Sequence, residues 1–71
     1  MVANTVRYWR QKLGLRQLEL SSKTGVSTSI IVATERYSYI PSKNVRHRLS
    51  EGMGVPEETL WPSLVVNANT K

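Results

Sequence analysis

The sequence of 71 residues contains no cysteine and no phenylalanine, and His47 is its only histidine. The absence of cysteine excludes disulfide bonds and thiolate metal sites, and it suits a reducing compartment. No apolar run approaches the roughly 18 residues that a membrane-spanning helix needs, and residues 1–5 lack the apolar core of a signal peptide. We therefore expect a cytoplasmic protein with no membrane partner.

The length limits the number of domains. A chain of 71 residues is close to the smallest size at which one hydrophobic core holds a fold without disulfides or metal. We expect a single domain over residues 1–64 and a flexible tail at residues 65–71, where no hydrophobic pattern is present. No second domain would then sense a ligand, so regulation would come from protein concentration, a partner or proteolysis.

Enzymatic classes lack the residues that they need. His47 lies between two arginines, and no carboxylate is evident at a spacing that would orient its ring. The sequence has no glycine-rich phosphate loop, no Ser-His-Asp set and no cluster of metal ligands. We predict that the protein is not an enzyme and requires neither a cofactor nor a metal.

Basic residues are concentrated in the first part of the chain. Residues 1–50 contain nine Lys or Arg and two Glu, a balance of +7, whereas residues 51–71 contain one Lys and three Glu, a balance of −2. A basic body favours a polyanion such as nucleic acid through counterion release. The same excess can also serve only to keep a small domain in solution, so charge alone leaves both interpretations open.

Hydrophobic spacing and helix-breaking residues predict an all-helical chain. Apolar residues recur three or four positions apart, and Gly, Pro, Ser or Thr separates each run from the next. We expect helices at about residues 6–13, 16–23, 28–36, 42–53 and 56–61, with Asn4 or Thr5 capping the first. The expected core consists of Val6, Trp9, Leu13, Leu15, Leu20, Val26, Ile31, Leu49, Met53, Leu60 and Trp61.

The most informative stretch runs from Gln17 to Arg36. Two short helical runs flank a break at residues 24–26, where the turn is expected to need a positive φ that Gly25 adopts without strain. Ser27 can cap the second run. Two short helices joined by a tight turn with a central glycine form the helix-turn-helix unit, whose second helix enters the major groove of DNA.

The joint spacing of these features resembles the phage-repressor and Cro-type, or Xre-like, helix-turn-helix family over about residues 6–61. The matching residues are Arg10, Gly14-Leu15-Arg16-Gln17, Leu20, Gly25-Val26-Ser27, Ile31, Glu35-Arg36, Pro41-Ser42, Gly54-Val55 and Leu60-Trp61. The resemblance implies a compact five-helix, lambda-repressor-like DNA-binding domain. It also implies a bacterial or phage-encoded protein that associates with the nucleoid.

The resemblance assigns roles to particular residues. It implies that Arg10 and Glu35 form a structural ion pair between the first and third helices. It implies that Gln17 contacts a DNA phosphate and braces the recognition helix, and the alternative is an ordinary solvated residue at a helix start. The expected base-facing residues are Thr28, Ser29, Val32 and Ala33, and the expected phosphate contacts are Arg16, Gln17, Arg36 and Lys43.

The base-facing positions have an unusual composition for a recognition helix. None is a Gln, Asn or Arg that could make a bidentate hydrogen bond to a base, whereas the Val32 and Ala33 methyl groups can pack against thymine methyl groups. One interpretation is methyl-rich readout of A·T pairs, and the other is contact between an apolar face and a protein. Ile30 on the same helix can instead lie partly in the core.

Other positions also depart from the family pattern. Thr34 occupies a position that is usually aliphatic, so its hydroxyl must bond a backbone carbonyl or loosen the packing, and Thr24 is a similar polar replacement. A basic cluster on the fourth helix could grip phosphates or could be a solvated face. Its members are Lys43, Arg46, His47 and Arg48.

Together these features predict sequence-specific binding of double-stranded DNA by a small stand-alone transcriptional regulator, a repressor of the phage or mobile-element type. Because one short helix reads few bases, we expect a homodimer on a pseudo-palindromic site with half-sites ~34 Å apart. The alternative is an antitoxin-like or anti-repressor-like module that keeps the fold, binds DNA weakly and has a protein partner.

Overall fold

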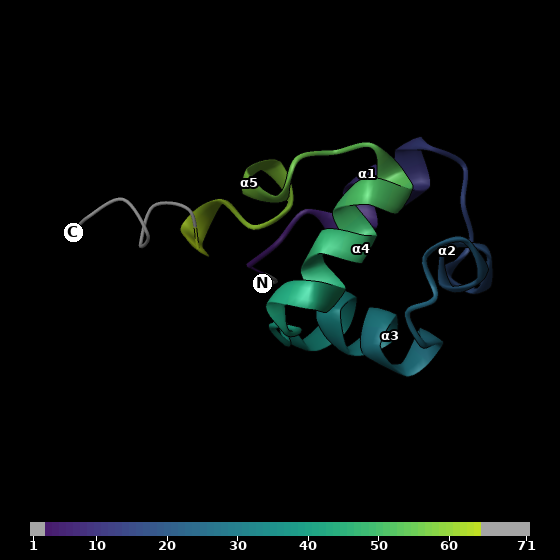
Figure 1. The fold of residues 1–71 in the computed structure, drawn as a ribbon, viewed down its shortest axis with the longest axis horizontal. Coiled ribbons are helices and arrows are strands. Elements are labelled where there is room, and N and C mark those ends of the chain that lie inside the picture. Colours follow the sequence, from purple (N-terminus) through teal and green to yellow (C-terminus); the bar gives the residue numbers. More distant parts are fainter. Residues whose placement is uncertain (1–2, 65–71) are drawn as a thin grey trace.

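The computed structural model describes residues 3–64, which form helices joined by short turns (Figure 1). The helices are α1 (Val6–Lys12), α2 (Gln17–Thr24), α3 (Thr28–Tyr37), α4 (Lys43–Met53) and α5 (Glu57–Leu60). Residues 62–64 add a further helical turn, and no strand occurs between residues 3 and 64. The predicted all-α class is confirmed, and the expected tail at residues 65–71 lies outside the described residues.

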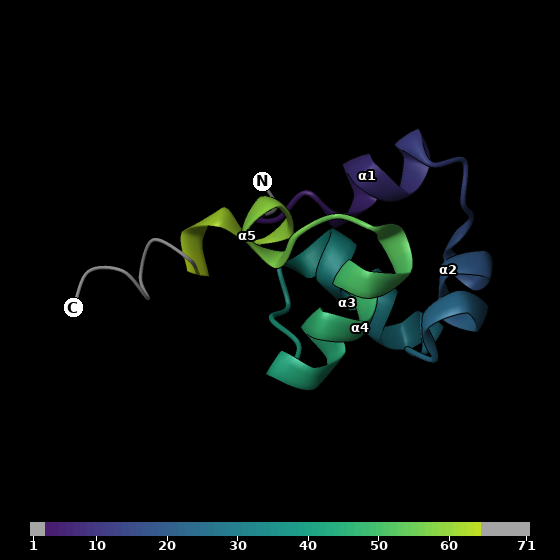
Figure 2. The same ribbon diagram turned by 45° about the horizontal axis from the view of Figure 1, so that its top comes forward.

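The helices are arranged around α4. In both views α2 and α5 lie at opposite ends of the helical body, and α4 lies between them (Figures 1 and 2). The second helix packs against both α3 and α4, whereas α1 packs against α3. This arrangement leaves one side of α3 uncovered beside the starts of α1 and α2.

The start of α1 is tied to two other parts of the fold. Asn4 caps the helix, because its Oδ1 accepts a hydrogen bond from the Val6 N–H at 3.0 Å. Thr5 does not cap, since its hydroxyl donates to the Thr59 carbonyl oxygen at 2.8 Å. Asn4 Nδ2 also donates to the Thr34 carbonyl oxygen at 2.9 Å, which attaches the start of α1 to α3.

The turn between α2 and α3 has the predicted conformation. Gly25 has a φ of 77°, and its N–H donates to the Ser21 carbonyl oxygen at 2.8 Å. The third helix begins as expected, with the Ser27 hydroxyl accepting from a backbone N–H three residues on at 3.3 Å. It ends one residue later than expected, at Tyr37, because Ser38 is the residue that takes the left-handed conformation, with a φ of 57°.

One hydrophobic core joins all the helices. Its buried apolar residues are Val6, Leu20, Val26, Ile31, Leu49, Met53, Val55, Leu60 and Trp61. Trp9, Leu15 and Ile30 are partly buried and pack against this core, so Ile30 belongs to the packing side of α3. The prediction for Leu13 was wrong, because 47% of this residue is exposed. Leu13 is the C-cap of α1 and still has helical backbone angles, so its exposure shows that the other helices do not cover this end of the helix.

The two threonines that replace aliphatic residues satisfy their hydroxyls within their own helices. Thr34 is fully buried, and its Oγ1 donates to the Ile30 carbonyl oxygen at 2.7 Å. Thr24 Oγ1 donates to the Leu20 carbonyl oxygen at 2.7 Å and accepts from the Val26 N–H at 3.2 Å. These hydrogen bonds to the backbone replace the hydrogen bonds to water that the hydroxyl groups lose on burial. Of the two predicted alternatives, bonding to a backbone carbonyl is therefore the one observed.

Gly52 of α4 lies directly against Thr24 of α2. A Cβ atom added to Gly52 would overlap Thr24 Cγ2. Thr24 cannot rotate this methyl group away without breaking its two backbone hydrogen bonds. The glycine in the middle of α4 therefore permits the contact between the helices, in spite of its poor helix propensity.

We expect Gly52→Ala to lower the free energy of unfolding by about 1–2 kcal/mol, because overpacking outweighs the better helix propensity of alanine. Thr24→Ser removes the overlapping methyl group and keeps the hydroxyl. In that background Gly52→Ala should be neutral or stabilising. Urea denaturation of the two single variants and the double variant measures this coupling, and additive effects would show that the two residues do not touch.

Candidate nucleic-acid interface

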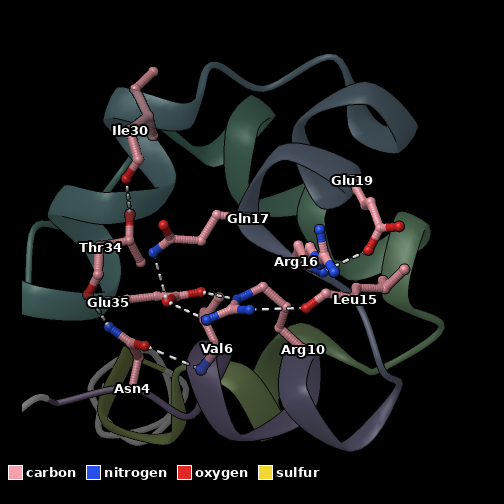
Figure 3. Close-up of polar contacts among 10 residues, drawn as sticks. All are labelled: Asn4, Val6, Arg10, Leu15, Arg16, Gln17, Glu19, Ile30, Thr34 and Glu35. Atoms are coloured by element: carbon pink, nitrogen blue, oxygen red, sulfur yellow. Dashed lines mark hydrogen bonds and ion pairs between the residues drawn. The ribbon is translucent and has the colours of Figure 1, made fainter.

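A buried ion pair fixes the position of α3 relative to α1. Arg10 Nε donates to Glu35 Oε2 at 2.7 Å, and Arg10 Nη2 donates to Glu35 Oε1 at 3.0 Å, so the pair is bidentate (Figure 3). The side chains are 10% and 2% exposed. Arg10 Nη1 donates to the Leu15 carbonyl oxygen at 2.8 Å, which extends the contact to the chain that leads into α2. The predicted pair is confirmed.

Gln17 joins the same network from the first position of α2. Its Nε2 donates to Glu35 Oε1 at 3.1 Å, and its carbonyl oxygen points away from the carboxylate (Figure 3). Gln17 therefore contacts α3 through Glu35, and it is not simply a solvated residue. Contact with a DNA phosphate stays a prediction for this residue.

The expected base-facing residues share one side of α3. Thr28, Val32 and Arg36 are each four residues apart, and Ser29 and Ala33 occupy the adjacent positions of the same side. Ser29 and Arg36 are exposed, whereas the other three are half-buried. This side is opposite Ile31, Thr34 and Glu35, which the fold covers.

A hollow of about 400 Å³ adjoins this side of α3. It is lined by Arg7, Arg10, Gln17, Val32, Glu35 and Arg36, and we call it the α1–α3 hollow. Glu35 neutralises Arg10, and no ion pair within residues 3–64 involves Arg7 or Arg36. The hollow therefore combines two guanidinium groups without a carboxylate partner with an amide, and anions are the ligands that suit such a site.

Arg7 was missed as a site residue in the sequence. It lies one helical turn before Arg10, so both arginines face the same side of α1. This spacing could have indicated that Arg7 belongs to the same site as Arg10. The inference would have required knowing that this side of α1 faces α3.

The other two expected phosphate contacts lie at the starts of helices. Arg16 is exposed directly before α2, where its backbone N–H donates to Glu19 Oε1 at 2.7 Å and leaves the guanidinium group available. Lys43 is exposed at the first position of α4. Neither residue lines the α1–α3 hollow.

The basic cluster on α4 is divided between different surroundings. Arg46 Nη1 donates to the Pro41 carbonyl oxygen at 2.7 Å, and Arg46 Nε lies 3.9 Å from Glu57 Oε1. His47 lies within 3.3 Å of Glu51 and 3.5 Å of Glu57. The expectation that no carboxylate orients His47 was wrong, because Glu51 is one helical turn away and α5 brings Glu57 to the same ring.

The remaining cations of this helix are on other sides. Arg48 packs near the turn between α2 and α3, where its Nη1 would be 3.2 Å from a Cβ added to Gly25. Only Lys43 and Arg48 in the cluster take part in no ion pair within residues 3–64. The four residues therefore do not form one continuous phosphate-binding surface.

Comparison with known proteins agrees with this geometry. A family model described as helix-turn-helix matches residues 6–60. The chain belongs to the helix-turn-helix family. An "uncharacterized HTH-type transcriptional regulator" of Methanothermobacter thermautotrophicus is 39% identical over 49 residues, which cover 69% of this chain and 71% of that protein. A protein with the same description from Methanocaldococcus jannaschii is 33% identical over 58 residues, which cover 82% and 88%.

Residues 3–64 contain neither a cluster of metal ligands nor a membrane-spanning helix. No group of three or more His, Cys, Asp or Glu side chains is arranged to hold a metal ion. No helix in the described part is long and apolar enough to cross a membrane.

Replacing Arg10 with Met should lower the free energy of unfolding by about 3–5 kcal/mol, because Glu35 would remain buried without its cation. The double variant Arg10→Met and Glu35→Leu should be more stable than Arg10→Met alone, since no buried charge is left. Thermal and urea denaturation measure both effects. A double variant less stable than Arg10→Met alone would show that the lone Glu35 carboxylate is not the cause of the loss.

Proposed function

We propose that this protein binds double-stranded DNA in a sequence-specific manner and acts as a small transcriptional regulator. The proposal rests above all on one observation. The uncovered side of α3 adjoins a hollow in which Arg7 and Arg36 have no carboxylate partner in the described chain. Membership of the helix-turn-helix family and the regulator descriptions of both relatives support it.

The proposed complex places α3 in the major groove. Thr28, Ser29, Val32 and Ala33 then face base edges, and the cations at the rim of the same side hold the phosphates. The phosphate contacts are Arg7, Arg16, Gln17, Arg36 and Lys43. The buried pair of Arg10 and Glu35 does not bind DNA itself, because its hydrogen-bonding groups already have partners.

We further propose the biological context. Two copies bind a pseudo-palindromic site, because a single α3 reads too few base pairs for useful specificity. The resemblance to phage repressors supports repression of the phage or mobile-element type, exerted in the cytoplasm at the nucleoid. A reporter gene placed behind the selected binding site tests this, because repression requires that co-expression of the protein lower transcription.

Arg36→Gln should weaken binding to specific and random duplexes by the same factor. It should also reduce the slope of log affinity against log salt concentration by about one, because one phosphate contact is lost. Arg7→Gln should behave in the same way. Thr28→Ala or Ser29→Ala should instead change the order of preference among sequences. Fluorescence anisotropy titrations at several salt concentrations, with duplexes selected from a random pool, measure all four variants.

Lys23→Gln is the matched control for the arginine variants. It removes one positive charge from a residue that lies beside Arg48 and Glu51, away from the α1–α3 hollow. Its salt slope should equal that of the original protein. If the original protein binds no duplex in a salt-dependent manner, the proposed function is wrong.

A second candidate function is a protein-interaction module, antitoxin-like or anti-repressor-like, and a specific surface favours it. Tyr37 at the end of α3 and Tyr39 and Ile40 in the loop that follows are 73%, 49% and 54% exposed. Neighbouring exposed apolar side chains often mark contacts with proteins. Salt-insensitive failure to bind DNA, together with a stable protein complex that Ile40→Ser and Tyr37→Ser abolish, would favour this candidate over the first.

A further inference from the structure

We propose that the uncovered side of α3 recognises the C5-methyl groups of thymine, so that the protein selects A·T pairs by apolar contact. This inference rests on the proposed function, since it specifies which feature of DNA the same site reads. It begins with what the site lacks. No amide, guanidinium or carboxylate group is present at Thr28, Ser29, Val32 or Ala33.

The usual means of reading a G·C pair is therefore absent from these four positions, and Arg36 on the same side is assigned to a phosphate. Guanine is read in the major groove by Arg or Lys at O6 and N7, and cytosine by a carboxylate that accepts from N4. The bidentate reading of adenine by Asn or Gln is also absent. The hydroxyl groups of Thr28 and Ser29 can donate or accept, so they bond to any of the four bases without strong discrimination.

The groups that remain are methyl groups. Val32 and Ala33 are half-buried against the fold, and the part of each that reaches the surface is hydrocarbon. Thymine is the only ordinary base with an apolar group at its major-groove edge. Contact between these groups removes hydrocarbon from water on both sides, which favours T·A over every other pair.

The arginines beside this apolar surface favour DNA as its ligand. Val32 lines the α1–α3 hollow together with Arg7 and Arg36, and Arg36 follows Val32 by one helical turn. A phosphate held by these arginines would bring a base edge beside the Val32 methyl groups. Ile30 and Ile31 pack in or against the core and take no part.

Uracil provides a direct test, because it differs from thymine only by the absence of the C5-methyl group. The full-length protein is titrated with an A·T-rich duplex selected from a random pool, and with the same duplex in which deoxyuridine replaces thymine one position at a time. Each contacted position should lose about fourfold in affinity, the effect expected for one buried methyl group. Equal affinity for both duplexes, with normal salt dependence, would overturn this inference and leave the proposed function intact.

A second arm presents the same methyl group on another base. A 5-methylcytosine·guanine pair at a contacted position keeps the C5-methyl group and changes the hydrogen-bonding edge. We expect affinity above that of the unmethylated C·G pair and close to that of T·A, because the contacted methyl group is the same. Affinity equal to that of the unmethylated C·G pair would overturn the assignment to the methyl group, and so would selection of G·C-rich sites from the random pool.

Protein variants link the effect to α3. Val32→Ser together with Ala33→Ser removes every methyl group of both residues and leaves hydroxyl groups, and it should bring the ratio of thymine to uracil affinities close to one at the positions that these residues contact. Arg36→Gln should weaken both duplexes equally and leave that ratio unchanged. Circular dichroism and thermal melting verify folding of the variants. If the ratio persists in the double variant, the α3 surface is not the reader and the inference is wrong.

Discussion

The bidentate contact between Arg10 and Glu35 is the constraint on which the arrangement of the site depends. It joins α1 to α3, and through the Leu15 carbonyl oxygen and the Gln17 amide it also holds the start of α2. Three helices of a small domain therefore meet at one buried carboxylate. A buried charge pair costs desolvation, so its value is in geometry as much as in stability. Since each polar group has a partner, α3 is held at a defined orientation before any ligand arrives.

The same network shapes the surface beside it. Because Glu35 is occupied by Arg10 and Gln17, it does not neutralise Arg7 or Arg36, which lie around the same hollow. The site thus separates two kinds of arginine: one is used to build the fold, and two stay available for an anion. The hydroxyl groups of Thr24 and Thr34 also serve the fold, since each bonds to a backbone carbonyl oxygen within its own helix.

The recognition helix has two sides of different chemistry that both contain apolar residues. Ile31 and Ile30 serve the core, whereas Val32 and Ala33 lie on the side next to the arginines. A helix of this composition could be taken for one that is entirely buried. The positive rim makes the outer side suitable for an anionic partner, because long-range electrostatic attraction acts before the apolar surface makes contact.

Local signals in the sequence were sufficient for the helices and the glycine turn at Gly25, because each depends on residues within a few positions of one another. For Thr34 they left two alternatives, and the structure selects the hydrogen bond to the Ile30 carbonyl oxygen. The resemblance supplied the Arg10–Glu35 pair. Tertiary structure decided the rest. Leu13 continues the helical geometry of α1 but is 47% exposed, because its burial depended on how far along α1 the other helices extend. The contact of Gln17 with Glu35, the place of Arg7 in the hollow and the pairing of His47 with Glu57 depend on which sides of the helices face each other. Helical periodicity does not specify this, because residues 17 and 35, or 47 and 57, are too far apart in the chain.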